Sequence, residues 1–443
     1  MVLVVVLLVV TLLAAVHWYV WRRLVRDVTR PGGLARRLGT AAAVVLPLLS
    51  LGALTSGRLD APFALQQLLS WPGFLWLACL LYLTLALVVT EPARALLLRR
   101  SVDRDRSAVD QDRRFAVGSR SAGAERVGTA ERPPAGDEGV TTAPAAPPTT
   151  TATAVAEPEA PAQDPQAAAV TRRLFVSRVI AGTAAAAAAA TVAHGTYGVL
   201  RGPQVKRVTV PLAKLARGAH GYRIAVVSDI HIGPILGRAH TQRIVDAINA
   251  TQPDLIAVVG DLVDGTVENL GPAAEPLARL RARDGSFFVT GNHEYFSGAE
   301  EWVDRVRELG LRPLRNERVE IPGFDLAGVN DVAGVNYGDG PDFARALGDR
   351  DRTRAAVLLA HQPVVVHDAV RHGVDLQLSG HTHGGQMWPG NFLAELANPT
   401  VAGLERYGDT QLYVSRGAGA WGPPVRVGAP SDITVVELAS RQA

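Results

Sequence analysis

The run from Leu255 to Asp264, Leu-Ile-Ala-Val-Val-Gly-Asp-Leu-Val-Asp, constrains the fold of this chain more than any other stretch. Its β-branched apolar half predicts a strand buried on both faces. Gly260 and the carboxylates Asp261 and Asp264 follow directly, at the edge of an open α/β sheet where ligands bind. Taken alone, such a pattern is more often a solvated turn with two ordinary acids.

Four further apolar runs end in the same way, and they span residues 222–228, 286–290, 355–360 and 376–379. The polar residues that follow these four runs are Asp229, His231, Asn292, His293, Glu294, His361, His381 and His383. A single Asp-x-His or His-x-His is usually structural, but five such strand ends in succession predict one site. Carboxylate, amide and imidazole ligands without a thiolate suit two divalent ions such as Mn, Fe or Zn.

The part of the chain that carries these runs, residues 208–440, alternates apolar strands with helical stretches, among them a helix predicted at Glu275 to Arg283. Some 230 residues suit one α/β domain. The alternating units and the late strand pairs predict two sheets with helices outside them. Gly260, Gly291 and Gly380 each precede a candidate ligand, where a residue without a side chain lets the backbone turn tightly.

The order of these motifs, Asp-x-His, Gly-Asp, Gly-Asn-His, His and Gly-His-x-His, resembles that of the calcineurin-like metallophosphoesterases. The fuller strings Val-Gly-Asp-Leu-Val-Asp-Gly and Ser-Gly-His-Thr-His-Gly-Gly-Gln are similar to the membrane-associated bacterial branch typified by YkuE and YaeI. The resemblance covers the whole 208–440 region and implies a four-layer α-β-β-α sandwich. Residues before 200 lie outside the family core.

The resemblance also implies roles for the candidate residues. One metal ion would be held by Asp229, His231 and His383, and the other by Asn292, His361 and His381. Asp261 would bridge both ions, and a water between them would become the hydroxide that attacks phosphorus.

His293 would stabilise the developing charge or protonate the leaving oxygen, with Asp264 holding its ring. We expect Gln386 and Arg426 to contact substrate and Glu294 to have a structural role.

Residues 1–100 are predicted to form a membrane region with three spans, Met1 to about Val20, Leu38 to Thr55 (interrupted by Pro47) and Trp71 to Thr90. A cleaved signal peptide is disfavoured for the first, because no basic region precedes it and no small-residue cleavage site follows it. The connection after the first span and the stretch after the third are rich in arginine, whereas Arg58 stands alone between the second and third. Positively charged connections stay in the cytoplasm, so the amino terminus is expected outside.

Residues 101–170 lose aromatic and branched residues and predict a disordered linker, most clearly from Thr141 to Ala169. Arg172 and Arg173 then precede an Ala-rich run that ends near Leu200. A paired arginine before such a segment is typical of a twin-arginine export signal, which would make the export machinery a partner. The alternative is an Ala-rich helix packed on the other spans. If this segment crosses the membrane, the domain after it lies outside the cytoplasm; if not, the domain stays inside.

Composition excludes other classes of function. The net charge is only +3, and no Lys/Arg block interleaved with aromatics supports nucleic-acid binding. The single cysteine, Cys79, excludes an internal disulfide and a thiolate metal site.

We therefore expect a multi-pass, membrane-anchored dimetal phosphoesterase, a phosphatase or phosphodiesterase, whose catalytic domain is extracytoplasmic. Proximity to the bilayer suggests phospholipids or lipid-linked envelope intermediates as substrates. The alternative is a non-catalytic receptor or scaffold that binds a phosphorylated ligand on the same fold. Sequence spacing does not mark the choice between monoesters and diesters.

Overall fold

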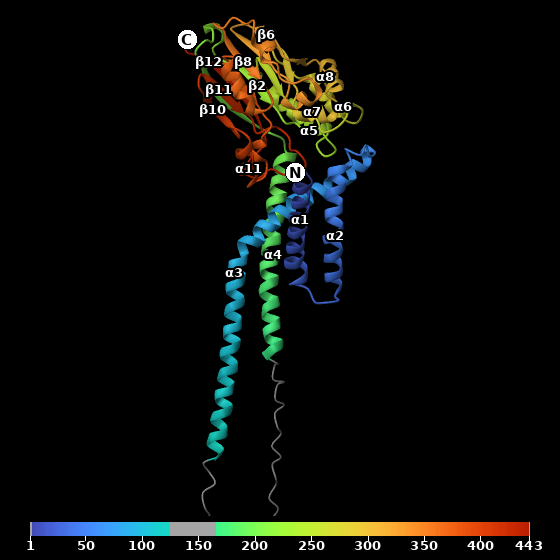
Figure 1. Ribbon diagram of the computed structural model, residues 1–443, viewed down its shortest axis with the longest axis vertical. Helices are drawn as coiled ribbons and strands as arrows, with labels where there is room; N and C mark the ends of the chain where they lie inside the picture. Colours follow the sequence, from blue (N-terminus) through green and yellow to red (C-terminus); the bar gives the residue numbers. More distant parts are fainter. Residues whose placement is uncertain (1, 125–164, 443) are drawn as a thin grey trace, which may run out of the picture.

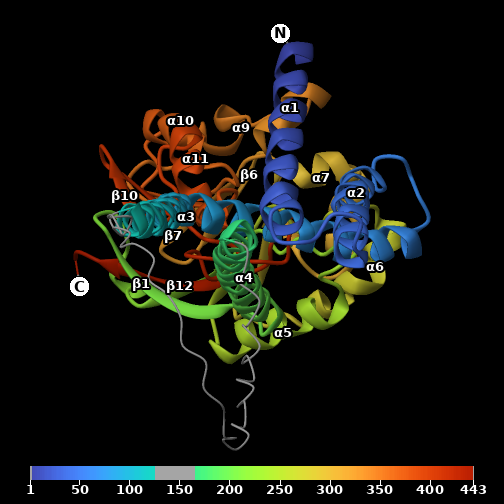
Figure 2. The same ribbon diagram turned by 90° about the horizontal axis from the view of Figure 1, so that it is seen from below.

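The computed structural model describes residues 2–124 and 165–442. Within them, four helices have the length and apolar composition to cross a membrane. These are α1 (Val2–Trp21), α2 (Leu34–Thr55), α3 (Phe63–Ala124) and α4 (Pro165–Leu200), with a short π-helical segment, η1 (Arg22–Arg26), after α1. Pro47 lies inside α2, and Pro72 and Pro92 inside α3. All four stand below the rest of the molecule (Figures 1 and 2).

The helices α3 and α4 differ from the predicted linker at both of its edges. α3 continues to Ala124 and α4 begins at Pro165, so residues 101–124 and 165–170 are helical. Loss of branched and aromatic residues shows that a segment cannot build a core, but a helix satisfies its own backbone hydrogen bonds, and Arg, Ala and Gln favour it. The rest of the predicted linker, 125–164, lies outside the described residues.

Ion pairs join the segment that follows α1 to α3, at the end of α1 farther from the sheets. Arg23 contacts Asp27 at 2.9 Å and Glu91 of α3 at 2.7 Å, and Arg94 contacts Asp27 at 3.3 Å. The fourth helix joins them there, because Arg178 Nε donates to the Val28 carbonyl at 3.0 Å. The arginine-rich end of the bundle and the α/β domain thus lie at opposite ends of the helices (Figure 1).

Residues 204–440 form two six-stranded mixed sheets. The first has the order β1-β12-β2-β3-β4-β5 and the second β10-β11-β9-β8-β7-β6. The strands of the first are β1 (Gln204–Leu212), β2 (Tyr222–Val227), β3 (Leu255–Val259), β4 (Ser286–Val289), β5 (Arg312–Pro313) and β12 (Asp432–Ser440). Those of the second are β6 (Glu317–Ile321), β7 (Phe324–Gly328), β8 (Ala355–Leu359), β9 (Leu376–Ser379), β10 (Gly403–Tyr407) and β11 (Thr410–Val414).

Helices cover the outer faces of both sheets. The α-helices are α5 (Arg238–Ala250), α6 (Val267–Ala274), α7 (Asn292–Ser297), α8 (Ala299–Glu308), α9 (Phe343–Leu347), α10 (Val366–Arg371) and α11 (Gly390–Ala397). Short 3₁₀ turns are η2 (Arg217–Ala219), η3 (Glu275–Arg279), η4 (Val332–Tyr337), η5 (Pro363–Val365) and η6 (His383–Gly385).

Alternation along the strands builds three apolar layers between these elements. Ile224 and Leu326 belong to the cluster between the two sheets, whereas Ala225 packs with α5 and α8 on the outside of the first. A further cluster joins β8 to α9 and α10. The predicted four-layer α-β-β-α sandwich is therefore confirmed. It places the parallel strands β2, β3 and β4 of one sheet and β8 and β9 of the other with their carboxyl ends together.

One predicted helix, Glu275–Arg283, is wrong in its bounds. The structure has α6 at Val267–Ala274 and a 3₁₀ turn at Glu275–Arg279. Pro272 and Pro276 explain the difference, because a proline removes a backbone donor and fits best in the first turn of a helix.

Candidate metal centre

The loops after β2, β3, β4, β8 and β9 bring the predicted ligands into one place between the two sheets. Five of these residues adopt left-handed backbone angles that side-chain-bearing residues rarely take; they are Asp229, His231, Asp261, His381 and His383, with φ between 49° and 74°. Such conformations are strained and cluster at functional sites, where the surrounding fold enforces them. Here they turn each side chain back across the end of its strand.

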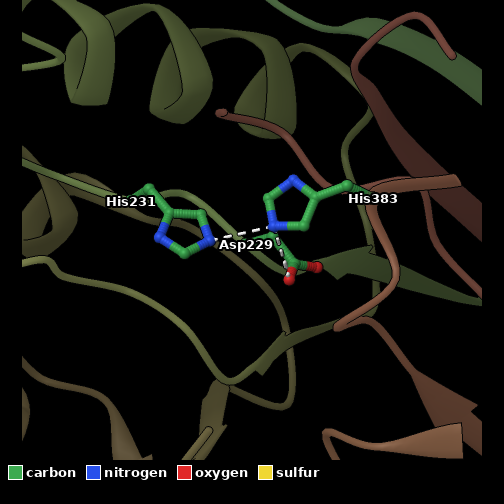
Figure 3. A group of neighbouring side chains, drawn as sticks. All are labelled: Asp229, His231 and His383. Atoms are coloured by element: carbon green, nitrogen blue, oxygen red, sulfur yellow. Dashed lines mark hydrogen bonds and ion pairs between the residues drawn. The ribbon is translucent and has the colours of Figure 1, made fainter. Parts of the chain in front are cut away.

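Asp229, His231 and His383 form the first group (Figure 3). The Nε2 atoms of His231 and His383 lie 3.0 Å apart, and His383 Nε2 is 3.4 Å from Asp229 Oδ1. Atoms held about 2 Å from one ion lie at such separations from each other. Burial raises the pKa of the Asp229 carboxyl, so its ionised form needs a cation nearby.

Asp261, His361 and His381 form the second group. His361 Nδ1 donates to the Val259 carbonyl at 2.9 Å, so its Nε2 faces Asp261 Oδ2 at 3.1 Å. That Nε2 atom is buried and lacks a hydrogen-bond partner. Asn292 Oδ1 lies 3.0 Å from His381 Nδ1, which adds an amide oxygen to this group.

Asp261 lies between the two groups. Its Oδ2 is 3.1 Å from His361 Nε2 and 3.9 Å from His231 Nε2, while its Oδ1 accepts from the His293 amide at 2.9 Å. Burial works to raise the pKa of Asp261, yet the imidazole of His361 holds it well below its ordinary value. A buried carboxylate shared by two sets of imidazole and oxygen donors fits a pair of divalent ions.

Glycines make room for these carboxylates. A Cβ on Gly291 would lie 2.3 Å from Asp261 Oδ1, and one on Gly380 would lie 2.4 Å from Asp229 Oδ2. The sequence predicts that glycine allows a tight turn at both positions. The close approach of a carboxylate oxygen to the backbone is a second reason why glycine is needed there.

Comparisons with known proteins agree with this geometry. The sequence model described as calcineurin-like phosphoesterase matches residues 222–385. An uncharacterized metallophosphoesterase of Aquifex aeolicus is 35% identical over 240 residues, which cover 53% of this chain and 91% of that protein. The chain belongs to the calcineurin-like metallophosphoesterases.

Other relatives of this metallophosphoesterase include membrane proteins by name. The zebrafish transmembrane protein with metallophosphoesterase domain is 38% identical over 259 residues, which cover 55% of this chain and 59% of that protein. YkuE of Bacillus subtilis is 28% identical over 289 residues, which cover 61% of this chain and 98% of that protein. The chain thus spans about three-fifths of the length of the zebrafish relative. Its four apolar helices and this likeness identify a multi-pass membrane protein.

Beside the two groups of candidate ligands, His293 and Asp264 form a close pair, which together with His231 makes a third group of metal-type donors. His293 Nδ1 lies 2.7 Å from Asp264 Oδ1, and the same oxygen lies 2.9 Å from His231 Nδ1. Burial disfavours the charged imidazole of His293, but Asp264 outweighs it and raises the pKa to about 9. Burial likewise works to raise the pKa of Asp264, yet the two imidazoles lower it to about 2. Without bound cations, the pair therefore favours a protonated His293 held by an ionised Asp264 at neutral pH.

Glu294 supports the backbone of the site. Its carboxylate accepts from the amides of Asp261 at 3.0 Å, Leu262 at 2.8 Å and Gly291 at 2.6 Å. Burial raises its pKa to about 7. These contacts agree with the structural role expected for Glu294, because they fix the two loops that carry Asp261 and Asn292.

Arg426 does not lie where a substrate contact was predicted. It is 5% exposed, and its Nη2 donates to His383 Nδ1 at 3.0 Å. Its other donors bond the carbonyls of Gly419, His383 and Ala429. A guanidinium has no acceptor, so the proton of a neutral His383 ring lies on Nε2, and an ion at Nε2 would replace that proton. Arg426 therefore holds the His383 ring from its Nδ1 side, and its buried guanidinium is hydrogen-bonded within the protein.

Gln386 is also used within the protein. Its Nε2 donates to the carbonyls of Trp421 at 2.9 Å and Pro423 at 3.1 Å, and its Oε1 accepts from the Trp421 amide at 2.9 Å. Gln386 therefore holds the 421–423 loop and does not make the predicted substrate contact, because both ends of its amide group are already hydrogen-bonded.

Two aromatic rings border His293, those of Phe296 and Trp421. The rings of Phe296 and Trp421 each lie 5.6 Å from the His293 ring, nearly at right angles to it. Phe296 is 69% exposed and Trp421 is 55% exposed. Phe296 follows Asn292 by four residues on α7, so helical spacing from a ligand was the available signal.

Proposed function

We propose that this protein is a membrane-anchored dimetal phosphoesterase that hydrolyses phosphate monoesters or diesters. The observation that carries the proposal is Asp261, a buried carboxylate between two groups of metal-type donors. Family membership supports phosphoester chemistry, and the helices support action at a membrane.

Each ion would have its own ligands and share Asp261. Asp229, His231 and His383 would hold one ion, and Asn292, His361 and His381 the other, which suits Mn, Fe or Zn. Two bound divalent ions would neutralise phosphoryl oxygens and supply an activated water for in-line attack. The hydrogen bonds from His231 to Asp264 and from His361 to Val259 orient both rings with Nε2 toward the ions.

His293 would act on the leaving group. Its Nδ1 is engaged by Asp264 at 2.7 Å, so its Nε2 proton is free to pass to the leaving oxygen as the ester bond breaks. Asp264 keeps the ring charged and oriented without taking the proton. A receptor or scaffold that only bound a phosphorylated ligand would have no use for such an acid, and this pair therefore favours an enzyme.

The orientation in the membrane follows from charge. The arginine-rich connection between α1 and α2 lies at the end of the bundle opposite the α/β domain (Figure 1). Positive connections remain cytoplasmic, so the domain would face outside. A β-lactamase reporter fused after residue 443 should protect cells from ampicillin. Cells that stay sensitive to ampicillin although their lysate contains active reporter would place the domain in the cytoplasm.

Arg172 and Arg173, near the start of the apolar part of α4, would direct export by the twin-arginine route. Lysine at both positions should then trap the domain inside. Unchanged export of that variant would leave α4 as a packed Ala-rich span.

Phospholipids and lipid-linked envelope intermediates are the substrates we favour, because the site is tethered at the bilayer. The test of function is hydrolysis by the full-length protein in detergent, with Mn, Fe or Zn supplied. Both p-nitrophenyl phosphate and bis(p-nitrophenyl) phosphate would be assayed.

Asp261→Asn should lower turnover of whichever ester is used by at least about 10³-fold, since a shared charge is lost. Asp409→Asn is the matched control, because Asp409 is fully exposed in the β10–β11 turn. Wild-type protein that holds both ions yet hydrolyses neither ester nor any phospholipid would favour the receptor.

A further inference from the structure

Exposed apolar side chains of the α/β domain gather on α11 and the turn before it. Trp388 is 51% exposed, Phe392 56%, Leu393 72% and Leu396 85%. Positions 388, 392 and 396 recur every four residues, so the helical ones share a face. No residue of α11 is buried.

The segment that leads into α11 is fastened to the membrane helices. Tyr82 of α3 donates its hydroxyl proton to the carbonyl of Trp388 at 3.0 Å. Met387 and Val427 pack on the apolar cluster that contains Tyr82 and Val192. This contact continues directly from the bundle into the domain.

Figure 1 places α11 at the level of the upper end of α4 and of the beginning of α1. That level is the end of the apolar spans, because α1 begins at Val2 and α4 ends at Leu200. A helix with a wholly exposed apolar face at this depth meets lipid in any membrane that the bundle spans.

We propose that α11 lies in the bilayer surface with Phe392, Leu393 and Leu396 among the acyl chains, and that the site takes lipid phosphoesters from the adjoining headgroup layer. The second half of this proposal rests on the phosphoesterase function; the first half does not.

The metal centre adjoins this surface along the chain and in space. His383 precedes Trp388 by only five residues, through η6. On the other side of the site, the Trp421 ring borders His293, and Gly422 next to it lies against Phe74 of α3, since a Cβ there would be 3.5 Å from the Phe74 ring. The aromatic side of the site therefore contacts the same membrane helix that holds Trp388.

Lipid suits this face better than a protein partner does. The face of α11 that holds Phe392, Leu393 and Leu396 is apolar, and Glu395, also exposed, is the helix's single charged residue. The bilayer is present beside it whenever the bundle is inserted. An apolar face of this kind left in water would instead favour aggregation.

Depth-dependent quenching tests the membrane contact with the full-length protein. Because Cys79 is the single cysteine, Leu396→Cys in a Cys79→Ala background gives one labelling site. A bimane label at 396, in phosphatidylglycerol/phosphatidylcholine nanodiscs, should be quenched by lipid that carries a doxyl group on its acyl chain. Glu320→Cys, exposed on β6 at the far end of the domain, is the control and should not be quenched.

Equal quenching at the two positions, or none at 396, would overturn the membrane contact. A label at 396 that is shielded only as protein concentration rises in detergent would also overturn it, and would assign the face to a second copy of the chain.

Activity tests the lipid substrate. The double variant Leu393→Glu/Leu396→Glu should lose at least about tenfold in turnover of phosphatidic acid or phosphatidylglycerol in nanodiscs, because charges replace two exposed leucines that would lie among the acyl chains. Its turnover of the soluble nitrophenyl esters should match wild type. Leu404→Glu, on the exposed edge strand β10, is the matched control and should leave both unchanged.

Unaltered turnover of both lipids by the double variant would overturn the lipid route. Failure of the proposed function has a different signature: wild-type protein would hydrolyse neither lipid nor soluble ester while the label at 396 was still quenched.

Discussion

Nδ1 of His293 lies 2.7 Å from Oδ1 of Asp264, and the same oxygen lies 2.9 Å from Nδ1 of His231, a candidate metal ligand. The pair holds the imidazole charged and pointed toward the site. The expected role of His293 is to protonate a leaving group, and two predictions test this role.

First, His293→Gln should lower kcat by about 10²–10⁴-fold for an alkyl phosphate, since a general acid contributes that much. The loss should be far smaller for p-nitrophenyl esters, whose leaving group departs without a proton. Metal content should stay as in wild type. An equal loss on both esters would contradict the role and would indicate charge stabilisation instead.

Second, the rate on an alkyl phosphate should fall as pH rises, with a midpoint at or below about 9. The pKa of His293 is raised to about 9, so its acid form is present below that pH and is lost above it. Bound cations disfavour the imidazolium, which moves the midpoint downward and never upward. A pH–rate profile checks this. The alkaline limb should vanish in His293→Gln, and its survival there would assign it to another group.

Arg426 provides a third prediction, because it holds the His383 ring and its guanidinium is hydrogen-bonded within the protein. Arg426→Leu removes donors from three carbonyls and from His383 Nδ1, so we expect a loss of about 3 kcal/mol or more in the free energy of unfolding. Metal affinity should fall about 10–100-fold, as for other residues that orient ligands. Chelator competition measures it, with Arg426→Lys retaining part of both. Wild-type metal affinity with a raised KM alone would restore the predicted substrate contact.

Gly291 provides a fourth prediction. Its φ of −105° suits any residue, so Gly291→Ala tests space alone. The added Cβ would lie 2.3 Å from Asp261 Oδ1 and 2.5 Å from the Asp261 amide, which must push the shared carboxylate out of place. We expect turnover to fall at least about 10²-fold, as small displacements in a site do, with the fold retained by circular dichroism. Gly218→Ala, where a Cβ meets nothing within 4 Å, is the control. Normal turnover in Gly291→Ala would show that Asp261 tolerates displacement.

The sequence predicted the two sheets and the grouping of the candidate ligands because both depend on local patterns. A buried β-branched run such as Leu255–Val259 predicts a strand. A glycine followed by a carboxylate directly after the run predicts a candidate ligand at the carboxyl end of that strand. The edge strands were less visible: β10 has no buried residue, and β1 is largely exposed before Val210. Their alternation is weak because only one side or neither meets the core.

The supporting contacts could not be predicted for a different reason. Arg426 reaches His383 across 43 residues, and Gln386 reaches Trp421 across 35. Nothing near either residue in the sequence distinguishes an arginine that binds substrate from one that orients a histidine. The same holds for α11, because only the structure places its apolar face at the level where the membrane helices end.

The central claim is that Asp261 is a carboxylate shared by two ions. The most direct measurement is the number of divalent ions per chain in purified full-length protein, by inductively coupled plasma mass spectrometry after dialysis. We predict two ions in wild type and in Asp409→Asn, and one or fewer in Asp261→Asn, because the amide removes the negative charge that both ions share. Two ions retained by Asp261→Asn, or none bound by wild type when Mn, Fe or Zn is supplied, would contradict it.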